Sequence, residues 1–124
     1  MIILGNEYPL RYSVLAQSEI SEMLRDEENI NNLFDEKLSD IERKKNYAKV
    51  AIIMNKAYKH YMAFLNHEDT DAVESDLTVD AFLSAEYGEG VVAINEIIDT
   101  IRKGNMATIA AVANSKKKQE TKSN

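Results

Sequence analysis

The chain has 124 residues, of which 44% are hydrophobic and 29% are charged, with a net charge of −6 and no cysteine. This size fits one domain with a modest core, and the lack of cysteine excludes disulfide frameworks and cysteine–zinc sites from this sequence. The apolar runs are too short for a membrane helix, and the first residues lack the basic start and cleavage site of a signal peptide. The sequence therefore predicts a cytoplasmic protein without a membrane partner.

The opening residues predict a β-hairpin. Apolar side chains alternate with polar ones, as in a strand with one buried face, at Tyr8, Leu10, Tyr12 and Val14. Gly5 and Asn6 supply the turn, because both tolerate positive φ. Pro9 cannot donate to a strand ladder, and a loop of three or four residues puts it at a position where no donor is needed. We therefore expect a hairpin with the longer loop.

A first amphipathic helix is predicted after the hairpin. Ser13 can cap it, and it runs to about residue 28. Its inward-facing residues are Leu15, Ala16, Ile20, Met23 and Leu24. After a break at residues 29–32, Leu33 and Phe34 indicate a short helical turn.

The longest predicted helix spans residues 40–65. Ser39 and Glu42 have the spacing of a capping box, in which each side chain accepts from the backbone N–H of the other residue. An apolar stripe follows the helical period at Tyr47, Val50, Ala51, Met54, Tyr58, Tyr61, Met62 and Leu65. Ile52 and Ile53 widen this stripe, so we expect the middle of the helix to be enclosed on several sides.

Glycines are predicted to interrupt the second half of the chain. An acidic connector at 66–76 leads to a short helix capped by Thr78, with Leu77 and Phe82 at the positions of a hydrophobic staple. This helix is expected to end at Gly88, where Gly88-Glu89-Gly90 forms a flexible break.

A further amphipathic helix is predicted from its apolar residues, which are Val91, Ile94, Ile97, Ile98 and Ile101. It is expected to stop at Gly104, and a final short helix to span 106–113. Because glycine breaks flank it, this helix is the candidate to move and expose an apolar face to a partner.

These elements predict a mainly α (α+β) fold, in which an N-terminal β-hairpin packs on a bundle of about four to six helices. Residues 1–114 are predicted to form a single globular domain, with the hairpin at 1–13 and the helices at 14–114. Residues 115–124 are predicted to be a disordered charged tail.

Charge is segregated along the chain. Residues 43–59 hold six basic side chains and no acidic one, whereas residues 60–101 hold ten acidic side chains and no lysine or arginine. The segregated charges can pair within the fold or serve a partner, and the sequence leaves both open. In the second case the acidic connector can steer a basic segment toward the protein through Glu68, Asp69, Asp71 and Glu74.

The residues predict no catalytic, metal or cofactor site. His60 and His67 are seven residues apart, wider than the i, i+4 spacing typical of zinc sites on helices. The acidic connector lacks the central glycine of a calcium loop, and Gly88-Glu89-Gly90 lacks the rest of a phosphate-binding motif. No nucleophile has a base and an orienting group at recognisable spacing. We therefore predict a protein that is not an enzyme.

The opening sequence ILGNEYPLRYSVLAQSEISEML resembles that of phage tail assembly chaperones. The match falls on residues of the hairpin, namely Gly5, Asn6, Tyr8, Pro9, Leu10, Arg11 and Tyr12. The resemblance implies a non-catalytic phage or prophage protein in the cytoplasm of the bacterial host. It also implies binding to the tape measure protein, an aggregation-prone helical chain, and assistance in tail tube assembly.

Two further interactions follow from the sequence. A partner made of amphipathic helices needs an apolar surface, for which the row from Val91 to Ile101 is the candidate. A free hairpin edge could extend a sheet with a second copy, giving self-association. The alternative function is that of a small nucleic-acid-binding regulatory or structural phage protein that uses the basic helix 43–59. The negative net charge argues against nucleic acid.

Overall fold

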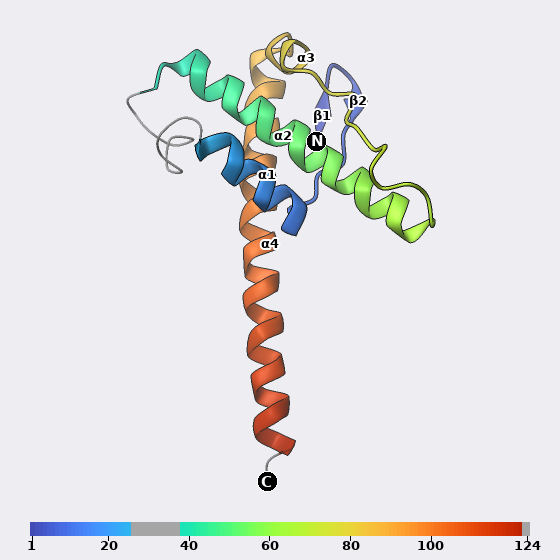
Figure 1. Ribbon diagram of the computed structural model, residues 1–124. Coiled ribbons are helices and arrows are strands. Elements are labelled where there is room, and N and C mark those ends of the chain that lie inside the picture. The colour runs from blue at the N-terminus through green and yellow to red at the C-terminus, as the bar shows by residue number, and fades with distance from the viewer. Residues whose placement is uncertain (26–37, 123–124) are drawn as a thin grey trace.

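The described residues of the computed structural model form a short hairpin followed by four helices, in the order β1 (Ile2–Ile3), β2 (Asn6–Glu7), α1 (Val14–Arg25), α2 (Asp40–Leu65), α3 (Val79–Leu83) and α4 (Tyr87–Lys122). The structure describes residues 1–25 and 38–122, with Arg25 and 107–122 described as helical backbone only. Helix α2 crosses α4, while α1, α3 and the hairpin pack around this crossing, and the C-terminal half of α4 extends away from the other elements (Figure 1). The predicted mainly helical α+β fold is confirmed.

The hairpin turns one residue earlier than predicted. Its two-residue turn is Leu4-Gly5, with positive φ values of 51° and 77°, and Ile3 pairs with Asn6. The ladder closes with Tyr8 N–H donating to Met1 O at 2.7 Å, so Pro9 lies beyond the paired residues. The predicted longer loop centred on Gly5 and Asn6 is therefore wrong, because moving the turn back frees Pro9 from the ladder without lengthening the loop.

Residues 8–13 are extended but form no strand. This segment crosses α2 and is held there by main-chain contacts, of which the Arg11 N–H to Met54 O bond measures 3.1 Å. The alternation of apolar and polar residues, which predicted a strand, therefore belongs to an extended segment that lies on α2. Tyr8, Leu10 and Tyr12 are half-buried against the core as the pattern requires, whereas Val14 is exposed.

The helix starts follow their predicted caps. Ser13 Oγ accepts from Ala16 N–H at 3.2 Å at the start of α1. At the start of α2, Ser39 Oγ accepts from Glu42 N–H at 3.2 Å and Glu42 Oε2 accepts from Ser39 N–H at 3.4 Å, which completes the capping box. Helix α2 has its predicted bounds, residues 40–65. The predicted end of α1 at residue 28 and the turn at Leu33 and Phe34 lie outside the described residues.

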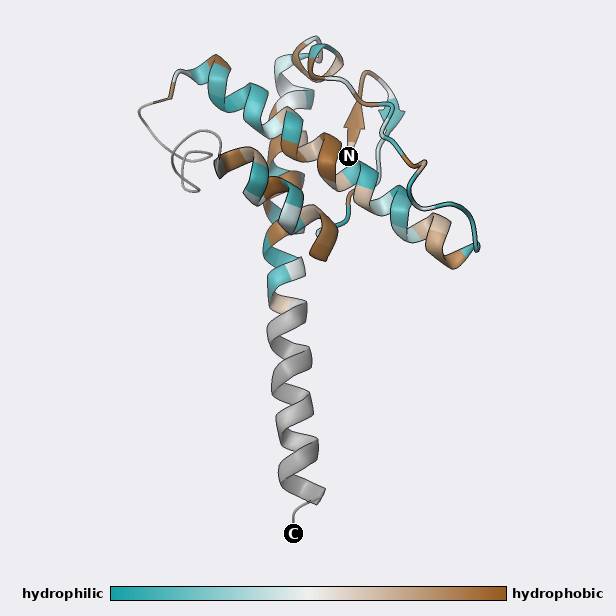
Figure 2. Ribbon diagram, viewed as in Figure 1, coloured by the Kyte–Doolittle hydropathy of each residue, from teal (hydrophilic) through white to brown (hydrophobic). Residues whose placement is uncertain are grey.

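The core lies where β1, α2 and α4 meet. Its largest fully buried apolar side chains come from these three elements and are Ile3, Val50, Met54 and Ile97. Brown apolar segments meet at this crossing in Figure 2. Burial of apolar area here is the main favourable term for the fold. The middle of α2 is enclosed on several sides, as its wide apolar stripe predicted.

A buried asparagine joins three segments beside this core. Asn55, at 1% exposure, donates from Nδ2 to Pro9 O at 2.9 Å, and its Oδ1 accepts from Ser75 Oγ at 2.6 Å. Ser75 Oγ in turn accepts from Leu77 N–H at 3.1 Å. A buried side-chain amide is stable only when its donors and acceptors are paired. Asn55 therefore fixes the segment after the hairpin and the connector against α2.

The chain folds differently from the prediction around its glycines. Thr78 caps α3 by accepting from Ala81 N–H at 3.1 Å, and the staple residues Leu77 and Phe82 are both buried. However, α3 ends at Leu83 rather than at Gly88.

Helix α4 then runs without interruption for 36 residues, through the glycines at positions 88, 90 and 104. The predicted glycine breaks and the separate helix 106–113 are wrong, and residues 115–122 are helical where a disordered tail was expected. A helical glycine costs only about 1 kcal/mol relative to alanine, which packing of the first half of α4 offsets. The segment after Gly104 is rich in good helix formers, with alanines in its first part and lysines, glutamine and glutamate near its end.

Gly104 is required for close packing. A Cβ atom at this position would lie 2.9 Å from Tyr12 Cδ1 and 3.2 Å from Tyr12 O. Gly104→Ala is therefore expected to lower the free energy of unfolding by about 1 kcal/mol, because overpacking costs about 1–3 kcal/mol and exceeds the gain in helix propensity. Gly90→Ala, which meets nothing within 4 Å, should instead raise it by about 0.5–1 kcal/mol. Urea unfolding measures both, and equal stabilisation by the two substitutions would contradict the packing argument.

Candidate protein-binding groove

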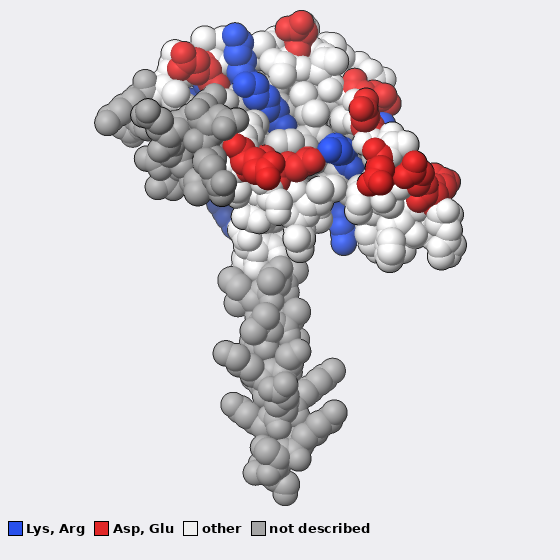
Figure 3. Space-filling view, viewed as in Figure 1, with Lys and Arg blue, Asp and Glu red and all other residues white. Residues whose placement is uncertain are grey.

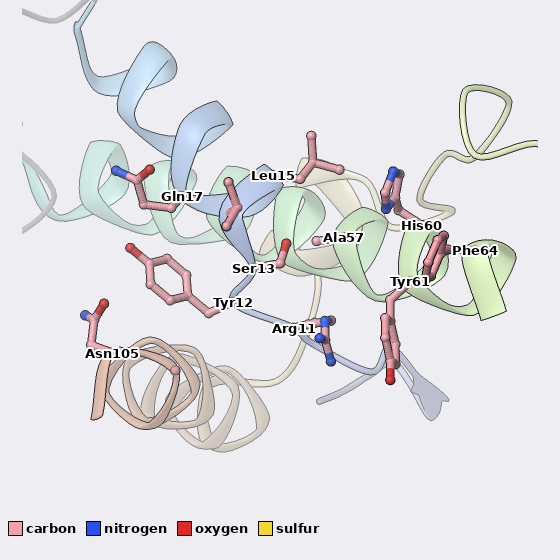
Figure 4. A pocket seen from close by; sticks show the side chains of 12 residues that line it. Arg11, Tyr12, Ser13, Leu15, Gln17, Ala57, His60, Tyr61, Phe64 and Asn105 are labelled. Atoms are coloured by element: carbon pink, nitrogen blue, oxygen red, sulfur yellow. The ribbon is translucent and has the colours of Figure 1, made fainter. Parts of the chain in front are cut away.

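An open groove of about 970 Å³ lies between α1, α2 and α4. Tyr12 and Asn105 lie on its α4 side, and Tyr61 and Phe64 line it from α2 (Figure 4). Residues 11–15 and Gln17, from the start of α1 and the segment before it, complete the lining together with Ala57, His60 and Gly104. The groove therefore lies between the start of α1, the C-terminal part of α2 and the middle of α4.

The walls of the groove carry large apolar side chains that the fold leaves in solvent. Val14 is 84% exposed and Phe64 is 65% exposed, and both line the groove. Leu65 and Met62 in the last turn of α2 are also exposed, at 48% and 37%, but do not line the groove. Large apolar side chains exposed on the walls of one groove are typical of a site of interaction with another molecule.

The charged side chains of the groove are basic. The guanidinium carbon of Arg11 lies 3.7 Å from the centroid of the Tyr61 ring, which is a close cation–π contact. His60 lines the same groove, and none of the described residues that line it is acidic. The groove therefore differs in sign from the protein as a whole, whose net charge is −6.

Local packing determines the shape of the groove. The hydrogen bond from Arg11 N–H to Met54 O anchors one wall to α2. The cap at Ser13 then turns the chain into α1, so that Val14 begins the helix on the solvent side. Gly104 lets Tyr12 approach α4 closely enough to form the groove floor.

The apolar row of α4 that was predicted to bind a partner lies largely inside the fold. Ile97 is fully buried in the core, and Ile94 and Ile101 are half-buried against it. Ile98 is also half-buried, and Val91 is 39% exposed. Since α4 is continuous through its glycines, the breaks that were expected to let this row move are wrong. In this conformation the row serves packing, and Ile97 is inaccessible to a partner.

Part of that row borders a smaller pocket of about 190 Å³ at the start of α4. Val91 and Ile94 line it together with Tyr87 and Lys44. The ammonium of Lys44 lies 5.4 Å from the Tyr87 ring centroid, which ties the first turn of α4 to α2.

The acidic connector lies at the end of α2, next to the Phe64 end of the groove. Glu68, Asp69, Asp71 and Glu74 are all exposed, and acidic side chains gather around this end of α2 in Figure 3. These side chains are therefore exposed to solvent, as their predicted role in steering a basic segment requires. Asp69 also has a local role, because its Oδ1 accepts from Asp71 N–H at 2.9 Å.

The two histidines occupy unrelated positions. His60 lines the groove. His67 has a positive φ of 57° and closes α2, with its N–H donating to Phe64 O at 3.3 Å and Glu68 N–H donating to Ala63 O at 2.8 Å. This is the Schellman arrangement, with His67 at the position that usually holds glycine. Within the described residues, no three histidine, aspartate or glutamate side chains are placed to hold a metal ion together.

Some basic residues of 43–59 make ion pairs within the fold, but among the described residues only the pair of Lys59 with Asp76 joins them to the acidic stretch 60–101. Lys56 contacts Glu19 at 2.7 Å, Lys59 contacts Asp76 at 3.0 Å and Lys44 contacts Asp40 at 2.8 Å. Three of the six basic residues in 43–59 are thereby committed to internal ion pairs, although such exposed pairs contribute little to stability. Basic side chains lie among acidic ones across this face in Figure 3.

Two residues of α2, Asp40 and Tyr47, have shifted pKa values, and neither lines the groove. The hydrogen bond from Lys44 lowers the pKa of the Asp40 carboxyl in the first turn of the helix. Burial raises the pKa of the Tyr47 hydroxyl, because the charged form loses hydration.

Sequence reasoning missed the groove residues Val14 and Phe64. Val14 continued the alternation of a strand that was expected to be half-buried, whereas the chain has already turned into α1 at that point. Phe64 lies off the apolar stripe of α2, and a large aromatic residue off the stripe at a helix end was the available signal.

No helix among the described residues is long and apolar enough to cross a membrane. Comparisons of the chain with protein-family models, with curated proteins and with solved structures find no match. The resemblance to phage tail assembly chaperones therefore rests on the opening sequence alone, chiefly on residues from Gly5 to Tyr12.

Proposed function

We propose that this protein is a non-catalytic tail assembly chaperone of a phage or prophage. It binds the tape measure protein in the cytoplasm of the bacterial host and keeps it soluble while the tail tube assembles. The observation that carries the proposal is the open groove, with Val14 and Phe64 exposed on its walls. A surface of this kind suits a helical partner that would otherwise aggregate through its apolar face.

The opening sequence adds support of a different kind. The residues that resemble the chaperone family form the hairpin and the extended segment, and the last two of them, Arg11 and Tyr12, line the groove. One short stretch of the chain therefore carries both the likeness and part of the apolar surface. Self-association through the hairpin edge has weaker support, because each strand is only two residues long.

The alternative, a nucleic-acid-binding protein that uses helix 43–59, has less support from the charges. Half of the basic residues in that stretch make ion pairs within the chain, and an acidic protein repels the phosphate backbone. Salt-sensitive DNA binding by the purified protein would favour this alternative.

Co-expression with the tape measure protein of the same genome tests the proposal. We expect the tape measure protein to stay in the soluble fraction and to copurify with the native chain. Phe64→Asp should reduce the copurified amount by about tenfold or more, because it places a charge on an apolar contact surface. Val92→Asp is the matched control, since Val92 is 67% exposed on α4 and does not line the groove. If the tape measure protein aggregates equally with and without the native chain, the proposal fails.

A further inference from the structure

The form of the groove indicates what kind of segment it takes. Helix α2 supplies one wall, α4 supplies the other, and the first turn of α1 closes one side. Surfaces between helices accept a further helix by placing its side-chain ridges into their grooves. The aromatic residues Tyr12, Tyr61 and Phe64 offer large contact areas with little loss of side-chain freedom.

The charge of the groove determines which kind of helix it binds best. Among the described residues, Arg11 makes no ion pair, and its guanidinium carbon lies over the Tyr61 ring, 3.7 Å from the centroid. A guanidinium that makes no ion pair has N–H groups that can bind a carboxylate with two parallel hydrogen bonds. The first turn of α1 follows directly and has no acidic side chain, so the positive end of its dipole adds to the same field.

We infer that the groove docks an amphipathic helix that carries an aspartate or glutamate on the edge of its apolar face, paired with Arg11. Apolar side chains of this helix pack on Phe64 and Val14, and its carboxylate meets the guanidinium. The inference rests on the proposed function for the identity of the partner, but the chemistry of the helix follows from the groove alone. A basic stretch beside this helix in the partner would lie near the acidic connector.

The overall negative charge of the protein opposes the binding of an acidic helix. With a net charge of −6, long-range attraction favours a basic peptide over an acidic one. A preference for an acidic peptide therefore requires a local basic site. At about 0.15 M salt, long-range interactions are screened beyond about 8 Å, and the contact with Arg11 dominates the comparison.

The test uses two fluorescently labelled synthetic peptides of equal length and identical apolar face. One carries glutamates on the edges of this face, and the other carries lysines at the same positions. Anisotropy with the full chain is expected to give a Kd for the glutamate peptide that is lower by about tenfold or more. Arg11→Gln should remove most of this difference, whereas Arg102→Gln, at an exposed arginine of α4 outside the groove, should preserve it. Phe64→Asp should weaken both peptides.

Equal affinity for the two peptides, tighter binding of the lysine peptide or binding of neither would overturn the inference. If the tape measure protein copurifies while the peptides show no such preference, the inference fails and the proposed function stands. If the glutamate peptide binds through Arg11 but the tape measure protein neither copurifies nor gains solubility, the proposed function fails and the groove serves another helical partner.

Discussion

Ile97→Ala is expected to lower the free energy of unfolding by about 3 kcal/mol. Ile97 is fully buried where α4 meets β1 and α2, so truncation removes apolar contacts and leaves a cavity that the surrounding helices cannot close. Small domains have only about 5–15 kcal/mol of stability in total, and the change should therefore be evident as a lower midpoint in urea unfolding.

Val92→Ala provides the control for this substitution. It lies on the same helix but is 67% exposed, and its effect should be within about 0.5 kcal/mol of zero. Equal small effects at the two positions would mean that Ile97 is not a core residue in solution. In that case the prediction that the α4 row binds a partner would regain its basis.

Asn55→Ala is expected to lower the free energy of unfolding by about 2–3 kcal/mol. Its amide donates to Pro9 O at 2.9 Å and accepts from Ser75 Oγ at 2.6 Å, in a site with 1% exposure. Truncation removes both bonds and leaves the Pro9 carbonyl without its donor. Chemical unfolding measures the loss of stability, and hydrogen exchange should show faster opening of residues 8–13 and of the connector.

Asn95→Ala controls for the change of residue type, because Asn95 is exposed on α4 and should tolerate alanine with little change. Ser75→Ala should fall between the two, since it removes one partner of Asn55 and the acceptor of Leu77 N–H. A loss at Asn55 no larger than at Asn95 would contradict the joining role given to this side chain.

Features determined by neighbouring residues were predictable from the sequence. The capping box of Ser39 and Glu42, the caps at Ser13 and Thr78 and the bounds of α2 depend on hydrogen bonds within a few residues. Their patterns predict structure directly, because local geometry leaves few alternatives.

The errors arose where distant segments decide the outcome. Pro9 lies beyond the paired strands, with its carbonyl bound by Asn55 of α2, and α4 continues through Gly104, which packs closely against Tyr12. The sequence marks both residues as turn or break signals. Tertiary contacts override such signals when they supply more than the roughly 1 kcal/mol that a helical glycine costs.

The groove itself could be predicted only in part. An apolar surface for a helical partner was expected, but it was assigned to the row that contains Ile97, which is buried in the core. Periodicity identifies an apolar face without telling which face meets the core and which meets solvent. The placement of Val14 and Phe64 around one groove follows from the crossing of α1, α2 and α4, which no local pattern encodes.

Site-specific photo-crosslinking tests most directly whether the partner binds in the groove. A photoreactive phenylalanine analogue at position 64 is compared with the same analogue at position 92, during co-expression with the tape measure protein. Position 64 lines the groove, and position 92 is equally open to solvent but lies elsewhere on α4. We predict a crosslink to the tape measure protein from position 64 and none from position 92. Crosslinking from position 92 alone, in a complex that still copurifies, would contradict the assignment of the groove as the binding site.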